Sequence, residues 1–340
     1  MGKLAPDALR EVLGCIKKTV EVIVPPMPGF DAGAHEIGDG MCVVIATDPC
    51  IGVPRKWFGW FLIHYSASDV ALFGAQPKFC TINLLGAPGT KKAVFKKVME
   101  QACVAADEVG INIVTGHTGT YEGISNLVGT CTVYGFLRKD EIITPAGAKP
   151  KDFLMCTKPI GLETVINFAL TDKTLAEKLF GPTRVRNLAK QIKMQTCVEE
   201  ALTLARIGVS AMHDATEGGF VAALNEIADV SHVGFQVDYT KLPVPPELHK
   251  LAKHFRLSRR QILSASSTGT LLAAVSPSNK DKAINMLSNR GFDAKVVGVF
   301  TKNKQRLIKY ERKKVKFPKT ANDPYAKILT KNSMMEKIRA

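Results

Sequence analysis

Three ionisable side chains and two adjacent glycines crowd one short segment, Ala211-Met-His-Asp-Ala-Thr-Glu-Gly-Gly-Phe220. An apolar run precedes the segment and residues 221–228 have helical spacing, so we expect a strand that turns into a helix here. Glycine lets backbone N–H groups approach a phosphate closely, and a helix N-terminus favours negative charge. The candidates for phosphate and cation chemistry in this turn are His213, Asp214, Glu217, Gly218 and Gly219.

Three further aspartates stand at or near the end of a predicted strand or the start of a predicted helix: Asp31, Asp48 and Asp69. A single aspartate in such a place is most often a helix cap or a turn residue. Asp69 differs, because it lies inside a helical pattern among apolar neighbours, where a carboxylate needs a partner or a cation. Several carboxylates together suit Mg²⁺, which proteins usually bind through carboxylates and substrate phosphates.

A second glycine-rich stretch, Thr115-Gly-His-Thr-Gly-Thr120, follows a predicted strand at residues 111–114. Neither glycine-rich stretch is a P-loop or a dinucleotide-binding fingerprint, and tight packing at a turn explains either one alone equally well. Taken with the aspartates, the two stretches predict a nucleoside triphosphate bound together with magnesium.

Strand and helix patterns alternate along the chain, which predicts an α/β (α+β) fold with parallel or mixed sheets covered by helices. Because 340 residues are many for one core, we expect two domains, with the boundary in a Pro- and Gly-containing linker at residues 144–150. The first block has predicted strands at 41–46, 79–85, 111–114 and 127–136 and helices at 57–74 and 91–109. The second has predicted strands at 153–157, 233–237, 270–275 and 294–300, with helices between 163 and 206.

The formal net charge of +15 is concentrated at the C-terminus, where residues 301–340 hold thirteen Lys or Arg and three acidic residues. Residues 306–310 and 314–317 partly alternate between apolar and basic, which predicts a short hairpin with one solvated, basic face. We favour an edge blunted by lysines over an RNA-binding surface, because aromatic residues are sparse. Nucleic acid is therefore not an expected partner, and deletion from Asn322 onward is expected to leave ligand binding intact.

The eight cysteines are scattered, mostly inside apolar runs and without a C-x-x-C pair, which favours reduced, buried thiols. The sequence shows no signal-peptide pattern. Its most apolar stretch, residues 57–75, contains His64 and Asp69, so a buried helix is a better interpretation than a membrane span. We expect a cytoplasmic protein without a membrane partner.

Six motifs in a fixed order resemble the aminoimidazole ribonucleotide (AIR) synthase superfamily, over roughly residues 6–300. The likeness is greatest to its hydrogenase expression/formation proteins and to archaeal AIR-synthase-related proteins. The motifs are Gly29-x-Asp-Ala-Gly33, Ala46-Thr-Asp-Pro49, Ala67-Ser-Asp-Val-Ala-Leu-Phe-Gly-Ala-Gln-Pro77, Thr115-Gly-His-Thr118, Thr157-Lys-Pro-Ile-Gly-Leu-Glu163 and His213-Asp-Ala-Thr-Glu-Gly-Gly219.

The resemblance implies an N-terminal ATP-binding and dimerisation domain at residues 1–148 and a C-terminal α/β sandwich domain at 149–303. Residues 304–340 then form a basic extension. It also implies a homodimer built through the N-terminal domains, with ATP and Mg²⁺ as cofactors. Members of the superfamily transfer the γ-phosphoryl group of ATP to an oxygen or selenium atom of a small substrate or a carrier-protein group.

Carried over by motif, the residues implied to hold magnesium and phosphates are Asp31, Asp48, Asp69 and Asp214. The residues implied to bind the nucleotide beside them are Gly116, Thr118, Glu217, Gly218 and Gly219, and the implied catalytic residues are Asp69, Asp214 and His117.

The sequence departs from the superfamily pattern at three places. Phe30 precedes Asp31 where members often have two adjacent aspartates, and His117 replaces the acid of several relatives, although selenophosphate synthetases share the Gly-His-Thr. The final residues lack the terminal cysteine that hydrogenase-maturation enzymes modify, so we do not expect that reaction. Gly14-Cys15-Ile16-Lys17 is similar to the reactive Cys and Lys of selenophosphate synthetases, although packing at the end of a first helix is the interpretation we favour.

Three hypotheses follow from the residues and the resemblance together. The first is an AIR-synthase-like enzyme that activates an oxygen by phosphorylation. The second is a small-molecule kinase resembling thiamine monophosphate kinase, whose phosphorylated molecule is the product. The third is a non-catalytic nucleotide-binding scaffold, which the single aspartate at Asp31 leaves open.

Overall fold

The structure is a computed structural model that describes residue 4, residues 6–17 and residues 19–329. By its internal contacts the chain divides into two compact units. The first unit comprises residues 10–142, and the second comprises residues 143 onward together with residues up to Leu9. The chain passes between the units within helix α1 (Pro6–Leu13) and again before the short helix η3 (Pro145–Gly147).

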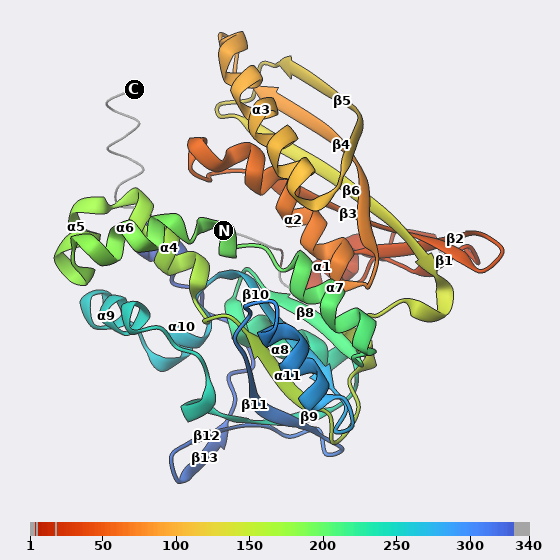
Figure 1. The fold of residues 1–340 in the computed structure, drawn as a ribbon, viewed down its shortest axis with the longest axis vertical. Coiled ribbons are helices and arrows are strands. Elements are labelled where there is room, and N and C mark those ends of the chain that lie inside the picture. Colours follow the sequence, from red (N-terminus) through yellow and green to blue (C-terminus); the bar gives the residue numbers. More distant parts are fainter. Residues whose placement is uncertain (1–3, 5, 18, 330–340) are drawn as a thin grey trace. The chain divides into compact units, whose positions relative to one another are not determined.

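The first unit is built on a six-stranded sheet in the order β1-β2-β3-β6-β4-β5 (Figure 1). Its strands are β1 (Val22–Val24), β2 (Gly33–Gly38), β3 (Met41–Cys50), β4 (Gln76–Gly86), β5 (Asn112–Thr120) and β6 (Val128–Arg138). Strands β4 and β5 are parallel, with helix α3 (Lys92–Val109) as their crossover, and the other neighbouring pairs are antiparallel. The sheet is therefore mixed, as the sequence predicted.

Two helices cover one face of this sheet: α2 (Phe58–Leu72), which follows the short helix η1 (Arg55–Trp57), and α3. Helix α2 packs on β3, β4, β6 and α3, and it is buried on nearly every side because its residues are apolar all round. The opposite face of the sheet carries partly exposed apolar side chains, including Ile45 and Phe136, each 38% exposed. Short helix η2 (Lys139–Glu141) ends the unit.

The second unit is built on a seven-stranded sheet in the order β13-β12-β9-β11-β7-β10-β8. Its strands are β7 (Phe153–Thr157), β8 (Ala211–Ala215), β9 (Gly234–Asp238), β10 (Ser267–Val275), β11 (Ala294–Thr301), β12 (Arg306–Tyr310) and β13 (Lys313–Lys316). Strands β9 and β12 are parallel, and the other neighbouring pairs of described strands are antiparallel. All nine residues of β10 are buried, so both of its faces are covered.

The helices of the second unit pack on this sheet and on one another. They are α4 (Leu162–Thr171), α5 (Lys173–Phe180), α6 (Pro182–Lys190), η4 (Ile192–Met194), α7 (Val198–Ile207), α8 (Gly219–Val230), η5 (Tyr239–Lys241), α9 (Pro246–Phe255), α10 (Arg259–Leu263) and α11 (Lys280–Ser288). Helices α4 and α8 contact β10, and α11 contacts β11 and α7. The predicted α/β fold class is confirmed.

Two local predictions about secondary structure have different outcomes. The predicted basic hairpin is confirmed as β12 and β13, and because β12 pairs with β9, residues 306–316 continue the sheet rather than stand apart from it. The prediction that residues 115–120 form a turn is wrong, because they complete strand β5. Gly116 permits this pairing, since a Cβ there would lie 2.0 Å from the carbonyl oxygen of Ile82 in β4.

Among the described residues, none of the helices combines the length and apolar composition that a membrane span needs. Helix α2, which holds the most apolar stretch of the sequence, has 15 residues and packs inside the first unit. The sequence-based interpretation of this stretch as a buried helix is confirmed.

Candidate functional site

Two of the predicted metal-binding aspartates lie on the same side of helix α2. The buried Ser66 hydroxyl lies 3.3 Å from Asp48 Oδ2 in β3 and 2.8 Å from the carbonyl oxygen of Cys131 in β6. Asp69, which is 7% exposed, follows Ser66 by three residues, so the two share one face of the helix. The first unit therefore brings the carboxylates of Asp48 and Asp69 to the side of α2 that faces the sheet.

Asp31 lies between β1 and β2 and is half-buried. The preceding Phe30, which replaces an acidic residue of the superfamily pattern, packs edge-on against Phe73 with ring centroids 6.2 Å apart. Phe73 caps the C-terminus of α2, the helix that carries Asp69. Phe30 thus ties the Asp31 segment to the end of that helix through an apolar contact.

His117, a predicted catalytic residue, lies away from Asp48 and Asp69 within the first unit. Strand β5 is the edge of the sheet, and β4 and β6 separate it from β3. His117 pairs with the exposed Asn83, so its side chain lies on the open face, whereas Asp48 points toward the helices. Its ring nitrogen Nε2 is within hydrogen-bond distance of the Tyr121 hydroxyl.

Gly116 and Thr118 lie beside His117 on this edge strand, where they pair with Ile82 and Leu84 and are exposed. Because these residues form a strand and not a turn, the close approach of β4 is enough to explain why residue 116 is a glycine. Nucleotide binding by these two residues stays a prediction.

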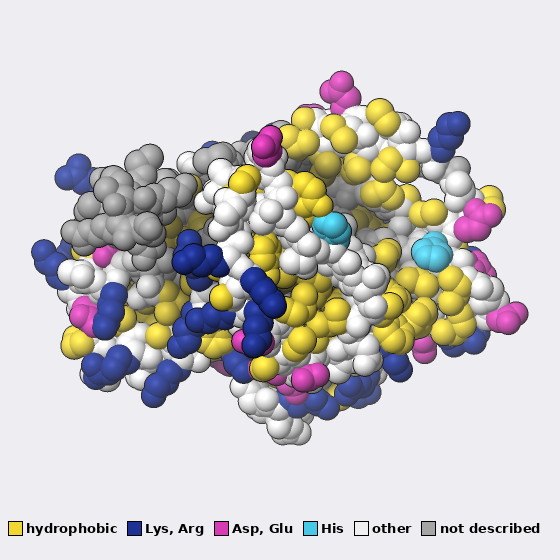
Figure 2. Space-filling view, turned by 90° about the horizontal axis from the view of Figure 1, so that it is seen from above, with side chains coloured by type: hydrophobic (Ala, Val, Ile, Leu, Met, Phe, Trp, Pro, Cys, Tyr) yellow, Lys and Arg dark blue, Asp and Glu magenta, His cyan; other side chains and the backbone are white. Residues whose placement is uncertain are grey.

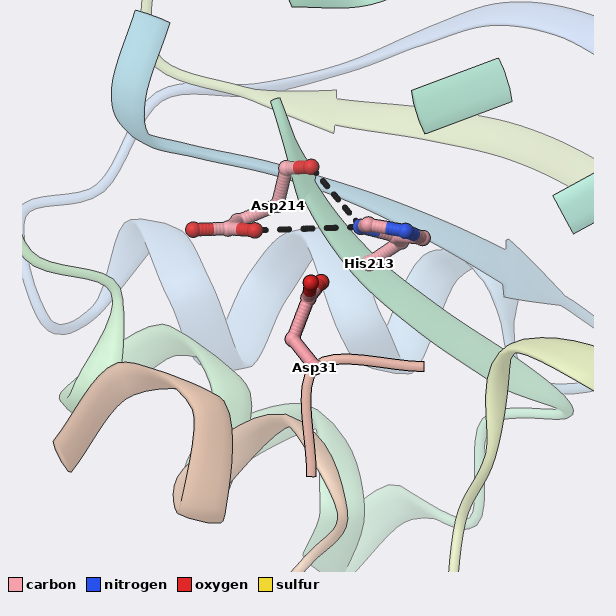
Figure 3. A group of neighbouring side chains, drawn as sticks. All are labelled: Asp31, His213 and Asp214. Atoms are coloured by element: carbon pink, nitrogen blue, oxygen red, sulfur yellow. Dashed lines mark hydrogen bonds and ion pairs between the residues drawn. The ribbon is translucent and has the colours of Figure 1, made fainter. Parts of the chain in front are cut away.

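In the second unit, His213 and Asp214 lie at the end of β8, the edge strand next to β10 (Figure 3). Both are buried, at 2% and 3% exposure. His213 Nδ1 lies 2.9 Å from the carbonyl oxygen of Asp214 and 3.7 Å from its Oδ1, and His213 Nε2 lies 2.9 Å from Glu226 Oε2 of helix α8. Glu226 of α8 thus fixes the position of the His213 ring. The ring in turn lies beside the Asp214 carboxylate.

The turn that follows Asp214 has the predicted strand-to-helix geometry. Glu217 is exposed, Gly218 caps the N-terminus of α8 and Gly219 is its first residue. Both glycines have positive φ, +78° and +55°, a region that side chains disfavour. A Cβ on Gly219 would lie 2.4 Å from the carbonyl oxygen of Ala265, so packing inside the unit already explains this glycine.

Sequence reasoning missed an acidic residue that contacts this turn. The carboxylate of Asp323 accepts a hydrogen bond of 2.9 Å from the Gly218 N–H and one of 2.5 Å from the Ser266 hydroxyl. The signals that could have drawn attention to these residues are weak: the hydroxyl-rich run Ser264-Ala-Ser-Ser-Thr268 and an Asp-Pro-Tyr sequence beyond the predicted hairpin.

Glu163, the last residue of the motif at residues 157–163, is a second acidic group near the turn. Burial raises its pKa to about 7, the hydrogen bond from Thr268 opposes that shift, and the charges of Asp323 and Glu217 add to it. A carboxyl group that titrates near neutral pH is suited to exchanging a proton there.

The cysteines have the predicted environment at most positions. Among the described thiols, six are buried and two, Cys15 and Cys103, are exposed. The interpretation of Cys15 as a packing residue is wrong, because it lies beyond the end of α1 with its side chain in solvent.

Charged side chains of both signs lie on the described surface. Figure 2 shows Lys and Arg side chains at many points of one face, with Asp and Glu side chains between them. The basic hairpin residues Lys309, Lys313, Lys314 and Lys316 are exposed. Lys309 lies 3.9 Å from Asp238, and Lys314 donates to Gln236.

Two family models match the chain in sequence order. The N-terminal domain of AIR synthase related proteins matches residues 29–137, and their C-terminal domain matches residues 149–309. The chain therefore belongs to the AIR synthase related family, as the sequence motifs indicated.

Within this family the chain is similar to proteins of two named kinds. It is 27% identical over 329 residues to the "Selenide, water dikinase" of Myxococcus xanthus (strain DK1622), covering 87% of this chain and 90% of the relative. It is 26% identical over 294 residues to the "Carbamoyl dehydratase HypE" of Cupriavidus necator, covering 84% of this chain and 80% of the relative. The predicted likeness to the hydrogenase-maturation members is confirmed.

A solved structure of the hydrogenase maturation protein HypE in complex with ATP has the same fold. The two share a TM-score of 0.68 at 17% sequence identity, over 95% of this chain and 97% of that one.

Proposed function

We propose that this chain is an ATP- and Mg²⁺-dependent enzyme that transfers the γ-phosphoryl group of ATP to an oxygen of a small substrate or a carrier-protein group. The observation that carries the proposal is that Asp48 contacts Ser66 of α2 while the buried Asp69 lies three residues further along the same helix. Burying a carboxylate is costly unless hydrogen bonds or a cation compensate its charge. Support also comes from the two enzyme relatives and from the ATP complex of similar fold.

The donor set fits magnesium. Carboxylate oxygens are hard ligands, and Mg²⁺ usually completes its shell with substrate phosphates and water. We assign the metal and phosphates to Asp31, Asp48, Asp69 and Asp214. When bound, the ion would neutralise negative charge on the phosphates.

The protein's own residues would then act by positioning. Ser66 orients the Asp48 carboxylate, and His213, held by Glu226, orients Asp214. The dipole of α8 would favour negative charge near its N-terminus, and we assign Glu217, Gly218 and Gly219 to the nucleotide site on the family motif alone. Phosphoryl transfer needs such positioning and charge neutralisation more than covalent help from the protein.

A homodimer built through the first unit is part of the proposal. The open face of its sheet carries partly exposed apolar residues, including Ile45 and Phe136. His117 lies on that same face, so a dimer built on this face would place it near the second copy. We include Gly116, His117 and Thr118 among the proposed nucleotide-binding residues on the family motif alone.

A second candidate is the transfer of phosphoryl groups to selenide. It is favoured by the similarity to a selenide, water dikinase and by the exposed thiol of Cys15. A small-molecule kinase and a non-catalytic nucleotide-binding scaffold remain as further alternatives within the fold.

Nucleotide products separate these candidates. Full-length protein is incubated with ATP, Mg²⁺ and a panel of carboxamide, alcohol and phosphate acceptors, or with selenide, and the products are identified by ³¹P NMR. The proposal predicts ADP and a phosphorylated oxygen, or inorganic phosphate formed from it. Selenophosphate that forms from selenide and ATP and is lost in Cys15→Ser would favour the second candidate, and Mg²⁺-ATP binding without any turnover would favour the scaffold.

A further inference from the structure

The residues that follow the basic hairpin form a strap across the second unit, here defined as residues 317–328. Phe317 is 4% exposed and packs edge-on against Phe235 of β9 and Phe220 of α8, with ring centroids 5.0 and 6.1 Å away. Asn225 of α8 donates to the carbonyl oxygen of Pro318 at 2.9 Å, and Arg260 Nε donates to that of Thr320 at 2.8 Å. The strap is therefore docked along α8 and α10.

Asp323 is the point at which the strap meets the turn after Asp214. Its Oδ2 accepts from the Gly218 N–H at 2.9 Å and from the Ser266 hydroxyl at 2.5 Å. Its Oδ1 accepts from the Tyr325 N–H at 2.9 Å, with the Ser266 N–H at 3.4 Å. One carboxylate thus joins the glycine turn, the residue before β10 and the strap itself.

The first N–H groups of a helix have no acceptor within the helix, and a carboxylate there gains from the helix dipole. Gly218, the N-cap of α8, has no side chain with which to supply that acceptor. Asp323 supplies it from a position 105 residues further along the chain. Ala321 closes the other side of the turn, since a Cβ on Gly218 would lie 2.9 Å from the Cβ of Ala321.

Tyr325 extends the same contact toward α4. Its hydroxyl accepts a hydrogen bond of 2.9 Å from Asn167 and is also hydrogen-bonded to Glu163. The strap therefore links the glycine turn to α4, which carries both of these residues, as well as to β10. These contacts oppose the expectation that deletion from Asn322 onward leaves Mg²⁺-ATP binding intact, which stays a prediction.

We propose that Asp323 is a positioning residue for Mg²⁺-ATP binding: it fixes the turn of residues 216–219 and, through it, the Asp214 carboxylate. The inference rests on the proposed function, because it assigns Asp214 to the metal and phosphates. Asp323 itself does not touch the nucleotide, since both of its oxygens are engaged by the turn, Ser266 and the strap. For the same reason the Gly218 N–H is directed to Asp323 and not to a phosphate.

The test compares Asp323→Ala and Asp323→Asn with Lys319→Ala, a strap variant that removes an exposed side chain. The Kd for Mg²⁺ with a non-hydrolysable ATP analogue is measured by calorimetry on the full-length proteins. Hydrogen bonds to a charged group are stronger than neutral ones. Loss of those that hold the turn should therefore raise the Kd of Asp323→Ala by about tenfold to a hundredfold. Asp323→Asn keeps an acceptor oxygen and should recover most of that loss, and Lys319→Ala should bind like the wild type.

Two further readouts keep the inference testable. Amide hydrogen exchange at residues 216–219 should accelerate at least about tenfold in Asp323→Ala and be slowed again by added acetate, which can replace the lost carboxylate. If the wild type does not bind Mg²⁺-ATP, the proposed function fails, and the exchange experiment alone decides whether Asp323 holds the turn. A folded Asp323→Ala protein with wild-type Kd and wild-type exchange would overturn the inference.

Discussion

Thr268 Oγ1 donates a hydrogen bond of 2.6 Å to Oε2 of Glu163, joining the start of β10 to the first turn of α4. The same carboxyl group faces Asp323 and Glu217, and burial raises its pKa to about 7 from an ordinary value of 4.5. Between pH 4.5 and 7 the folded second unit therefore holds a proton on Glu163 more firmly than the unfolded chain does.

The stability of the second unit should fall as the pH rises from about 4.5 to about 7. Over that range the folded state holds a proton on Glu163 that the unfolded chain releases, so the contribution is complete below pH 4.5 and lost above pH 7. Glu163→Gln should remove this dependence and stabilise the protein at pH 8 by about 2 kcal/mol, a value reduced because the residue is partly exposed.

Urea unfolding at pH 5 and pH 8 measures this effect. Glu122→Gln, which changes an exposed carboxyl group, serves as the control and should retain the pH dependence of the wild type. Equal stability differences between Glu163→Gln and wild type at both pH values would show that Glu163 does not titrate in this range.

Gly219 should tolerate alanine much less well than Gly208. Both have positive φ, +55° and +79°, so each substitution carries the cost of a left-handed backbone, about 1 kcal/mol. At Gly219 the new Cβ would also lie 2.4 Å from a backbone oxygen, whereas nothing lies within 4 Å at Gly208. We expect Gly219→Ala to lower the free energy of unfolding by about 2 kcal/mol more than Gly208→Ala, as measured by chemical denaturation. Similar losses for the two variants would mean that the turn relaxes freely.

The open face of the first unit should be the dimer interface. Placing a charge in a buried apolar contact is strongly unfavourable, so Phe136→Glu should convert a dimer into a monomer in sedimentation equilibrium. Val104→Glu changes a residue of α3 that is 58% exposed and should leave the dimer intact. Dissociation by both variants, or by neither, would place the interface elsewhere.

The sequence predicted the fold well where local pattern and tertiary structure agree. The run into Asp214 and the helical spacing after Gly219 predicted the β8–α8 turn, because periodicity reports directly which face is buried. The glycines at 116 and 119 predict a turn at residues 115–120, but pairing with β4 makes these residues a strand. Here the pairing with β4, which is distant in sequence, outweighs the local conformational preference of the glycines.

The sequence predicted single residues of the candidate site but not the contacts between them, because those contacts join residues that are distant in sequence. Asp31, Asp48 and Asp214 each suggested a cap or turn residue, whereas Asp69, inside an apolar helical pattern, suggested a carboxylate that needs a partner or a cation. That Asp48 and Asp69 share one side of α2 depends on Ser66 and on the packing of α2 against β3, which a linear pattern does not contain. Asp323 was missed because its partner Gly218 is 105 residues away.

The central claim is that Asp69 helps to hold magnesium and ATP, and its most direct test is the affinity of Asp69→Asn for ATP with and without Mg²⁺. The substitution keeps the size of the side chain and removes its charge, so the fold should persist while metal-dependent affinity falls. Asp107→Asn, on the exposed surface of α3, is the matched control.

Calorimetric titration with a non-hydrolysable ATP analogue gives the decisive comparison, with unfolding curves confirming that all three proteins are folded. We predict that in Mg²⁺ the Kd of Asp69→Asn is at least about tenfold above that of the wild type, a loss of about 1.4 kcal/mol, while Asp107→Asn is unchanged. In EDTA the three proteins should bind with the same weak affinity. A folded Asp69→Asn protein that binds Mg²⁺-ATP as tightly as the wild type would contradict the account.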